Sequence, residues 1–366
     1  MKPILILGEA MGANEVRTGT PFVGASGVEL LRMLDEAGII DLSSEDLSFI
    51  SRFWNEGNPA HIDCIWRMHP ECYRANVFNF HPPGNRIENV CGPKNESVTG
   101  YPALVKSKYV HRSMIPELER LGNEIAEVDP NLVICLGNTP LWALCGSTGI
   151  SKVRGTTRLS THTVTGYKVL PTYHPAAVLR QWELRPTTVA DLVKAKREAA
   201  FPEVRRPKCE IWIEPTLADL EEFYGRFIRG AERLAVDIET AGNQVTCIGF
   251  APSCGVALVI PFLDSRRKGK SYWTTTGDEC AAWAFVQRVL QERRPYKVFQ
   301  NGTYDISFLW RSMGIKVYGA TEDSMLCHHA LQPESLKGLG FLGSIYSDHS
   351  AWKTERKSTT TIKKDE

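Results

Sequence analysis

Side chains that could hold a planar ring are concentrated in four short motifs within the first 180 residues. These are GEAMG at residues 8–12, the turn at residues 19–24 with Phe22, the strand end at Asn76, and His174 with the proline that follows. An asparagine amide offers a donor and an acceptor to a pyrimidine edge, and phenylalanine can stack on its face. A histidine can stabilise a negative leaving group, and glycine lets backbone N–H groups approach a ligand closely. Together the motifs predict a base-binding pocket.

The third and fourth motifs continue into segments that could contact DNA. The third runs on to Arg86, and the fourth continues as Ala177, Leu179 and Arg180. A leucine beside an arginine can wedge into stacked bases while a target nucleotide is flipped out of the helix. We therefore expect these four residues to bind DNA.

A second constellation lies in the C-terminal half of the chain. Asp237 and Glu239 are two residues apart in an apolar strand pattern, so both side chains point to one face. Two carboxylates placed in this way repel each other unless a cation lies between them, and hard divalent cations prefer oxygen ligands. Asp305, near the start of an expected helix, offers a third carboxylate. The pattern predicts a site for Mg²⁺ or Mn²⁺.

A third set of residues could bind zinc. His61 and Cys64 form one His-x-x-Cys pair, and His69 and Cys72 form another. Tetrahedral zinc accepts such ligands, although cysteines and histidines that occur by chance in a loop would show the same spacing. A zinc site here is therefore a hypothesis that competes with a plain loop.

The elements that must position the first constellation alternate in type. Strands are predicted at residues 4–7, 75–80, 132–136 and 168–171, and helices at residues 28–37 and 116–128. Alternation of this kind indicates an α/β layer fold with a mainly parallel sheet, in which ligands bind at the carboxyl ends of strands. The polar residues of the four motifs fall at those ends.

Changes in pattern predict the domain organisation. We expect a first domain at residues 1–203, a linker at 204–209, a second domain of α+β type at 210–352, and a disordered tail at 353–366. The 366 residues are enough for two cores, and the net charge of +1 requires any DNA-binding face to be local. The ten cysteines show no disulfide spacing, and the sequence has no signal-peptide or membrane-span pattern. These features favour a cytoplasmic protein.

In order and spacing, the four motifs of the first half resemble the uracil-DNA glycosylase superfamily, especially its iron–sulfur group, family four. The resemblance implies a three-layer αβα domain that hydrolyses the N-glycosidic bond of uracil, or of a modified pyrimidine, in DNA. By that resemblance Phe22 stacks on uracil, Asn76 reads its edge, and His174 assists departure of the uracil anion.

The same resemblance assigns the first glycine-rich turn. Glu9, Ala10 and Met11 would form the base-binding turn, with Glu9 positioning water. Met11 stands where the family usually has proline, and the cysteines of the family's cluster are missing. We therefore expect no iron–sulfur cluster. A pocket that recognises the base without cutting it is the competing hypothesis.

The second half resembles the 3′–5′ proofreading exonuclease domain of family-A DNA polymerases, a ribonuclease-H-like fold. Asp237 and Glu239 match its first motif, and Asn301 with Asp305 matches the second. The resemblance implies that the three carboxylates hold two metal ions that activate water, and that Asn301 contacts DNA. The family's third motif, Tyr-x-x-x-Asp, finds no match, so an incomplete exonuclease is expected. The implied partners are DNA, single-stranded or at 3′ ends, and the rest of a phage-type polymerase in the cytoplasm of a bacterial host.

Overall fold

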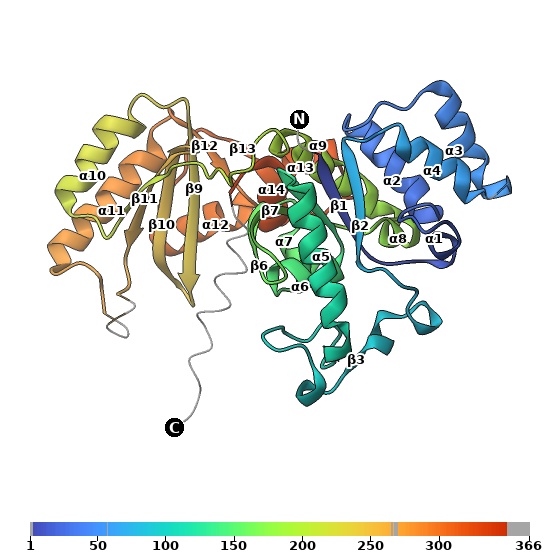
Figure 1. Ribbon diagram of the computed structural model, residues 1–366. Helices are drawn as coiled ribbons and strands as arrows, with labels where there is room; N and C mark the ends of the chain where they lie inside the picture. Colours follow the sequence, from blue (N-terminus) through green and yellow to red (C-terminus); the bar gives the residue numbers. More distant parts are fainter. Residues whose placement is uncertain (1–2, 57, 265, 267–269, 350–366) are drawn as a thin grey trace. The chain divides into compact units, whose positions relative to one another are not determined.

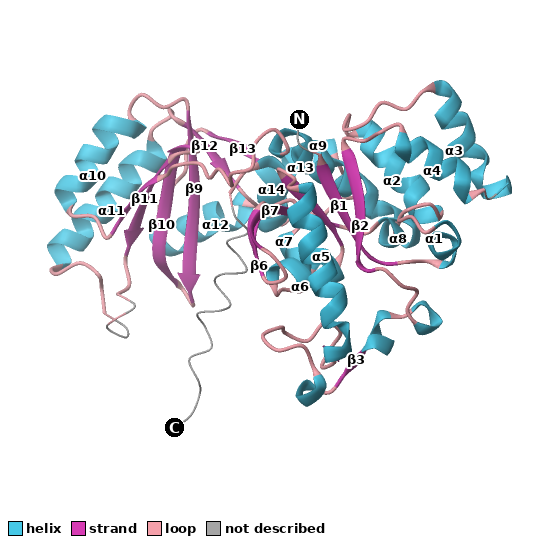
Figure 2. Ribbon diagram, viewed as in Figure 1, coloured by secondary structure: helices cyan, strands magenta, loops and turns pink. Residues whose placement is uncertain are grey.

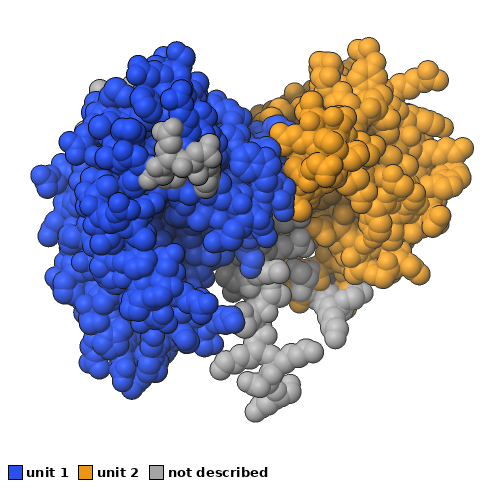
Figure 3. Space-filling view, turned by 90° about the vertical axis from the view of Figure 1, so that its right-hand side faces the viewer, with its two compact units in different colours: residues 1–206, 340–366 blue, residues 207–339 orange. Residues whose placement is uncertain are grey.

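The chain divides into two compact units. The structure, a computed structural model, describes residues 3–56, 58–264, 266 and 270–349. Unit 1 contains residues 1–206 and the chain from residue 340 onward, and unit 2 contains residues 207–339 (Figures 1 and 3). The division after Arg206 falls inside the predicted linker at 204–209. The tail predicted at 353–366 lies outside the described residues.

Unit 1 is built on a five-stranded sheet with the order β2-β1-β5-β7-β6 (Figure 2). Its strands are β1 (Ile4–Ala10), β2 (Cys72–Phe78), β5 (Leu132–Leu136), β6 (Arg158–Thr161) and β7 (Thr165–Thr172). Four strands are parallel, and β6, at the edge, is antiparallel to β7. The α/β prediction is confirmed, and the strand predicted at 132–136 coincides with β5.

Helices cover both faces of this sheet and make the predicted three layers. Alternate residues of β1 enter different cores, because side chains alternate along a strand: Ile6 packs on one face and Leu7 on the other. One core contains residues of α2 (Ala25–Glu36), α4 (Pro59–Arg67) and α9 (Arg185–Glu198). The opposite core contains residues of α5 (Ile115–Val128) and α6 (Asn138–Cys145).

Shorter elements complete unit 1. They are α1 (Ala13–Thr18), α3 (Ser44–Glu56), α7 (Ile150–Val153), α8 (Pro175–Arg180) and the two-residue strands β3 (Cys91–Gly92) and β4 (Tyr109–Val110). Single 3₁₀ turns occur at Pro83–Asn85, Ile87–Val90, Lys94–Glu96, Arg112–Met114 and Trp182–Leu184. The segment after His174, which carries the predicted DNA-contacting residues, is helix α8.

Unit 2 is a mixed sheet with helices, as the α+β prediction requires. Its six strands have the order β13-β12-β9-β10-β11-β8, with antiparallel β9, β10 and β11 at the centre. The strands are β8 (Glu210–Ile213), β9 (Arg233–Ala241), β10 (Gln244–Ser253), β11 (Val256–Pro261), β12 (Tyr296–Phe299) and β13 (Ala320–Asp323). The helices are α10 (Leu217–Phe223), which continues as a π-helical turn (Tyr224–Ile228), α11 (Thr276–Gln291), α12 (Gly302–Met313) and α13 (Ser324–Leu331).

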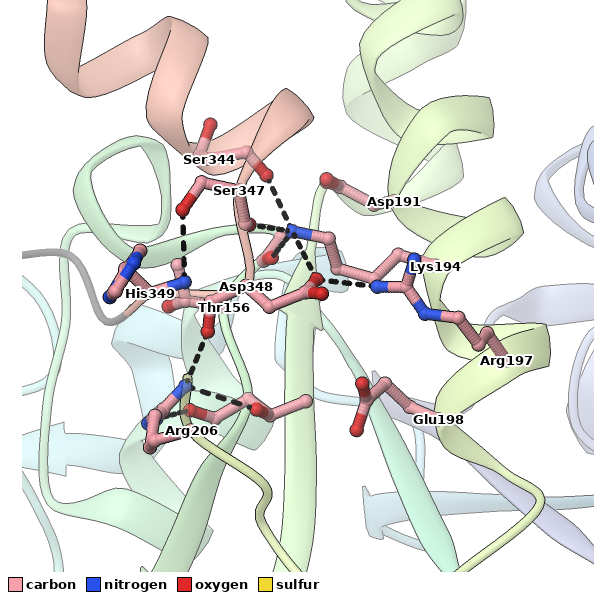
Figure 4. Close-up of polar contacts among 12 residues, drawn as sticks. Thr156, Asp191, Lys194, Arg197, Glu198, Arg206, Ser344, Ser347, Asp348 and His349 are labelled. Carbon is pink, nitrogen blue, oxygen red and sulfur yellow. Dashed lines mark hydrogen bonds and ion pairs between the residues drawn. The ribbon is translucent and has the colours of Figure 1, made fainter. Parts of the chain in front are cut away.

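The last helix, α14 (Leu339–Tyr346), corrects the predicted domain boundary. Residues 340–352 are predicted in the second domain, but the chain from residue 340 groups with unit 1. The reason is a set of polar contacts from α9 of unit 1 to Ser344, Ser347 and Asp348 (Figure 4). Unit 2 is therefore inserted into unit 1 rather than appended to it. Within the described part of the chain, no helix is long and apolar enough to cross a membrane.

Candidate active site

A cavity of about 410 Å³ opens in unit 1 at the carboxyl ends of β1, β2, β5 and β7. This is where parallel α/β sheets bind ligands. Seven residues predicted from the sequence line it: Glu9, Ala10, Phe22, Asn76, His174, Ala177 and Arg180. The four motifs thus converge on one cavity. Neighbouring wall residues to which the sequence analysis gave no role include Glu15, Asn85 and Tyr173.

Phe22 is held in an unusual backbone conformation. Its φ is +59°, a left-handed value that is costly for a residue with a bulky side chain. Its carbonyl oxygen accepts a hydrogen bond of 2.8 Å from the indole Nε1 of Trp66 in α4. A Cβ atom at Gly27 would lie 1.8 Å from that same oxygen, so the turn requires glycine there. The surrounding structure therefore fixes the ring of Phe22 at the cavity wall.

The rest of this turn is held by two further polar residues. Glu15 Oε1 accepts hydrogen bonds from the backbone N–H groups of Val23, at 3.1 Å, and Gly24, at 2.8 Å. Arg74 donates to the carbonyl oxygen of Pro21 at 3.0 Å. Sequence reasoning missed Glu15, Arg74 and Trp66, because their partners are eight or more residues away and follow no short pattern.

Asn76 is 3% exposed and packs directly over the first glycine-rich turn. A Cβ atom at Gly8 would lie 2.3 Å from Asn76 Oδ1 and 2.6 Å from Phe22 Cζ. Glycine at position 8 is therefore what allows the amide and the ring to meet beside the backbone. The amide nitrogen of Asn76 lies 3.5 Å from the sulfur of Met11, a weak acceptor.

Met11 does not line the cavity but is buried behind it, with 7% of its surface exposed. Its backbone N–H donates to the carbonyl of Phe80 at 3.2 Å, and its carbonyl accepts from His81 Nδ1 at 2.9 Å. These contacts fix the turn, so its thioether stays beside Asn76. Met11 thus acts on the cavity through the asparagine rather than by direct contact.

His174 follows the end of β7 and caps α8. Its Nδ1 accepts a hydrogen bond of 3.0 Å from the backbone N–H of Ala176, which places the proton of the neutral ring on Nε2. Burial lowers its pKa to about 4, and the positive charge of Arg180 acts in the same direction. Near neutral pH, His174 is therefore an uncharged donor. Its ring centroid lies 6.2 Å from that of Phe22.

Glu9 lies at the carboxyl end of β1. Its Oε2 accepts a hydrogen bond of 2.5 Å from the hydroxyl of Thr139, the second residue of α6. Burial raises the pKa of Glu9, and the hydrogen bond from Thr139 opposes that effect. Next to it, Asn138 Oδ1 accepts from the N–H groups of Gly149 and Ile150, at 2.9 Å each, and so shapes the wall formed by α7.

The predicted DNA-contacting residues are only partly at the cavity. Ala177 and Arg180 line it from α8, whereas Leu179, on the same helix, does not. Arg86 is exposed and lies outside the lining, where Asn85 is found instead. Leu179 and Arg86 therefore remain predictions of DNA contact beyond the base pocket.

The four residues of the zinc hypothesis are not brought together in the structure. His61 and Cys64 are exposed on α4, whereas Cys72 is buried at the start of β2. His69 Nδ1 pairs with Glu71 at 3.1 Å. In the described ranges, no three His, Cys, Asp or Glu residues form a group that could hold a metal ion. The helix α4 packs into the core through Trp66.

In unit 2, two elements place the three predicted carboxylates. Asp237 and Glu239 lie on the same exposed face of β9, as alternation requires. Asp305, in the first turn of α12, is 5% exposed, and its Oδ1 accepts from the N–H of Ile238 at 3.1 Å. Burial raises the pKa of Asp305 to about 6, opposed by that hydrogen bond and assisted by the charge of Asp237.

These carboxylates do not form a ready metal site. No group of three donors close enough for a metal is found in the described part of unit 2. Asn301 has a φ of +61° at the start of α12, and its N–H donates to Asp323 Oδ1 at 3.1 Å. Asp323 also accepts from Gly302 and Met325, at 2.8 and 2.9 Å, and these bonds lower its pKa against the effect of burial. The sequence reading missed this anchoring carboxylate.

Comparison with known proteins gives matches to both halves of the chain. The sequence model of the uracil DNA glycosylase superfamily matches residues 1–200. The type-4 uracil-DNA glycosylase of Saccharolobus solfataricus is 30% identical over 200 residues, covering 53% of this chain and 69% of the relative. That of Thermotoga maritima is 28% identical over 197 residues, covering 53% and 76%. A DNA polymerase of Bacillus phage SP01 is 23% identical over 266 residues, covering 63% of this chain and 27% of the polymerase.

Two solved structures show a partial likeness to the chain. Brucella melitensis NrnC with bound Mg²⁺ has a TM-score of 0.26 and 17% identity, over 40% of this chain and 64% of that one. The Trypanosoma brucei RNase D complex with RNA U12 has a TM-score of 0.31 and 18% identity, over 43% of this chain and 52% of that one. This chain therefore spans less than two thirds of either structure.

Proposed function

Because the chain belongs to the uracil DNA glycosylase superfamily, we propose that unit 1 hydrolyses the N-glycosidic bond of uracil, or of a related modified pyrimidine, in DNA. The observation that carries the proposal is the convergence of Phe22, Asn76 and His174 on one cavity at the carboxyl end of the sheet. A ring for stacking, an amide for edge recognition and a neutral donor are the groups that base excision requires. They come from three separate elements of the chain.

In the proposed reaction, a flipped base enters the cavity and stacks on Phe22. Asn76 offers the base edge its amide oxygen, and its amide nitrogen if that atom leaves Met11. As the bond between the sugar C1′ and the base N1 breaks, the sugar becomes oxocarbenium-like and the base leaves as an anion. The neutral His174 donates its Nε2 proton as a hydrogen bond to the anionic base oxygen and so stabilises the leaving group.

Water completes the hydrolysis on the sugar side. The carboxylate of Glu9, whose orientation is set by Thr139, would hold this water and face the developing positive charge. The oxygen of the water bonds to C1′, one of its protons passes to solvent or to the base, and the products are an abasic site and the free base. Arg180, at the cavity rim, would pair with a backbone phosphate.

Release of free base from a uracil-containing single strand tests the proposal. Wild type should release uracil, and Asn76→Ala should do so at least about a hundredfold more slowly, since edge recognition and leaving-group placement are lost together. Asn89→Ala, an exposed asparagine outside the cavity lining, is the matched control. No release by wild type, or equal release by Asn76→Ala, would reject excision.

One observation favours a second function for the same cavity, recognition without cleavage. Asn76 Nδ2 is engaged by the sulfur of Met11, so one of the two groups that read the base edge is occupied. A pocket in this state would hold a uracil-containing strand without aligning its base for cleavage, and so leave the glycosidic bond intact. Binding to such a strand without any abasic product would identify this function.

For unit 2 we propose a metal-dependent 3′–5′ exonuclease module. Its support is the placement of Asp237 and Glu239 on one face of β9, beside an Asp305 whose pKa is raised to about 6. Because the three carboxylates do not stand together as a metal group, ion binding would require them to move closer. Calorimetric titration with Mg²⁺ or Mn²⁺ should show binding that Asp237→Ala abolishes and that Asp219→Ala, at an exposed helix start, retains.

We infer a role in phage-type DNA replication or repair from the similarity to a phage DNA polymerase. The chain covers 27% of that phage DNA polymerase, so the polymerase part of such a protein is the proposed partner. DNA, single-stranded or at a 3′ end, is the proposed substrate of both units. The cytoplasm of a bacterial host is the corresponding location. Co-purification of this chain with a polymerase polypeptide from infected cells would test the partnership.

A further inference from the structure

The contacts of the chain after unit 2 reach deep into unit 1. Lys194 of α9, 9% exposed, donates from its Nζ to the carbonyl oxygens of Ser344, at 2.9 Å, and Ser347, at 2.7 Å (Figure 4). The same amine donates to the carbonyl of Gly155 at 2.9 Å. One buried cation therefore joins residues 340–349, here called the C-terminal strap, to the segment that follows α7.

A buried ion pair lies directly under the strap. Arg154 and Asp191 are each 1% exposed and form a bidentate pair, with Arg154 Nε donating to Asp191 Oδ2 at 2.7 Å. Arg154 also donates from Nη1 to the hydroxyl of Ser344 at 2.8 Å. The strap thus satisfies a remaining donor of the pair and helps to exclude water from it. Hydrogen bonds of such a pair are stronger when water is excluded.

The same pair connects to the strand that carries His174. Asp191 Oδ2 accepts a hydrogen bond of 2.6 Å from the hydroxyl of Thr172, two residues before His174 in the chain. The carbonyl of Thr172 in turn accepts from the N–H of Gly137, which lines the cavity, at 2.9 Å. A continuous set of hydrogen bonds therefore runs from Ser344 through Arg154 and Asp191 to the cavity wall.

Gly155 shows how closely the strap fits. Its φ is +70°, and a Cβ atom there would lie 2.4 Å from Asp191 Oδ1 and 3.0 Å from the carbonyl oxygen of Ser344. Its N–H donates to the carbonyl of Pro171, in β7. Glycine is thus needed where the strap carbonyl and the buried carboxylate both press against the backbone behind β7.

We propose that the C-terminal strap is a positioning element of the glycosylase cavity, which holds the end of β7 and His174 in place through the Arg154–Asp191–Thr172 hydrogen bonds. The cavity is then complete only with a segment that follows the whole of unit 2. Arg154, Asp191 and Lys194 are positioning residues, because none of them lines the cavity. The role of His174 in excision rests on the proposed function. The position of His174 can be measured whether or not the protein excises a base.

The test uses hydrogen exchange on the full chain with three variants. Lys194→Met removes the donor to Ser344 and Ser347 but keeps an apolar stem. Asp348→Asn removes the charge that pairs with Arg197, at 2.5 Å, and more distantly with Lys194, at 4.0 Å, but leaves the hydrogen bonds of Lys194 to the strap in place. This milder variant keeps the proposal testable if Lys194→Met fails to fold. Lys196→Met, an exposed lysine on the same helix, is the matched control.

Exchange should rise together at two places. In Lys194→Met we expect amides of the strap, and the amides of residues 176–178, which bond to His174, to exchange about tenfold faster. In Asp348→Asn we expect a rise of about twofold at both places, and in Lys196→Met none. Faster exchange of the strap with unchanged exchange at residues 176–178, in either variant, would overturn the proposal. So would an unchanged strap in Lys194→Met.

A kinetic readout separates positioning from simple destabilisation. Phe22 and Asn76 do not contact the strap network, so Lys194→Met should bind a uracil-containing strand within about twofold of wild type. Its single-turnover excision rate should fall about tenfold, since leaving-group stabilisation depends on the placement of His174. Equal losses of binding and rate would indicate general damage and reject positioning. Absence of excision by wild type would reject the proposed function alone, because the exchange result stands independently.

Discussion

At the scale of single residues, Met11 controls which atoms Asn76 can offer to a base. Its sulfur accepts from the amide nitrogen at 3.5 Å, and a base that needs this donor must displace the contact. Met11→Leu keeps the approximate volume and removes the acceptor. We expect the variant to bind a uracil-containing strand about two- to fivefold more tightly, because a weak competing hydrogen bond is lost.

Fluorescence anisotropy with labelled DNA measures this change. Met33→Leu is the matched control, since Met33 is fully buried in α2 and does not line the cavity. Weaker binding by Met11→Leu would show instead that the sulfur orients Asn76 productively. In that case the thioether would be part of base recognition rather than its competitor.

His174 predicts how the stability of unit 1 depends on pH. Its folded-state pKa of about 4 lies below the unfolded value of about 6.5, so the unfolded chain takes up the proton first as the pH falls. The contribution is fully present above about pH 6.5 and is lost towards pH 4, with a magnitude of about 3 kcal/mol. Urea unfolding at several pH values should show this loss in wild type and a smaller loss in His174→Gln. His61→Gln, at an exposed position on α4, should keep the wild-type dependence.

At the scale of secondary-structure elements, α4 supports the stacking ring. Trp66 donates to the carbonyl of Phe22 across 44 positions of sequence, and Trp66→Phe leaves that buried oxygen without its donor. We expect unit 1 to lose about 1–3 kcal/mol of unfolding free energy, together with affinity for a uracil-containing strand. Thermal unfolding and anisotropy measure the two effects. Trp182→Phe, at a tryptophan 58% exposed, should change neither, and equal stability of both variants would contradict this role of α4.

The sequence predicted the elements that carry short, local signals. Strand β5 has an apolar run buried on both faces, so its limits could be read directly. The strand expected at residues 75–80 is β2 (Cys72–Phe78), so Asn76 lies inside it, two residues before its end. The supports could not be read in this way. Trp66 and Glu15 act on a distant turn by one or two hydrogen bonds, which no periodic pattern reports. The spacing of His and Cys residues before β2 suggested zinc, because residue types and spacing do not show that Cys72 is buried in the core.

The C-terminal strap shows a different limit of sequence reading. Its residues 340–349 follow the inserted segment 207–339 directly, so contiguity assigned them to the second domain. Lys194 and Arg154, the partners of Ser344 in the strap, lie 150 and 190 positions earlier in the chain. A boundary of this kind depends on which surface a helix packs against, and that is decided by tertiary contacts alone.

At the scale of the whole molecule, the two units have separate cores and should unfold separately. Phe223 is fully buried in the core of unit 2, and Phe223→Ala should cost that unit about 3–5 kcal/mol. Calorimetry should show the unit 2 transition at a lower temperature and a distinct transition for unit 1. Tyr318→Ala, at a tyrosine 47% exposed in unit 2, is the control. A single transition that shifts as a whole in Phe223→Ala would contradict independent cores.

The insertion of unit 2 between Arg206 and the strap also links the two units through chain entropy. When residues 207–339 unfold, their ends stay pinned to unit 1 for as long as the strap remains docked, which closes a loop of roughly 130 residues. Closing a flexible loop of that length costs on the order of 4 kcal/mol of conformational entropy. A folded unit 2 already holds its two ends in place, so this cost arises only when unit 2 unfolds. Loss of structure in unit 2 would therefore tend to release the strap. The glycosylase cavity would in this way sense the folding state of the inserted unit through topology alone.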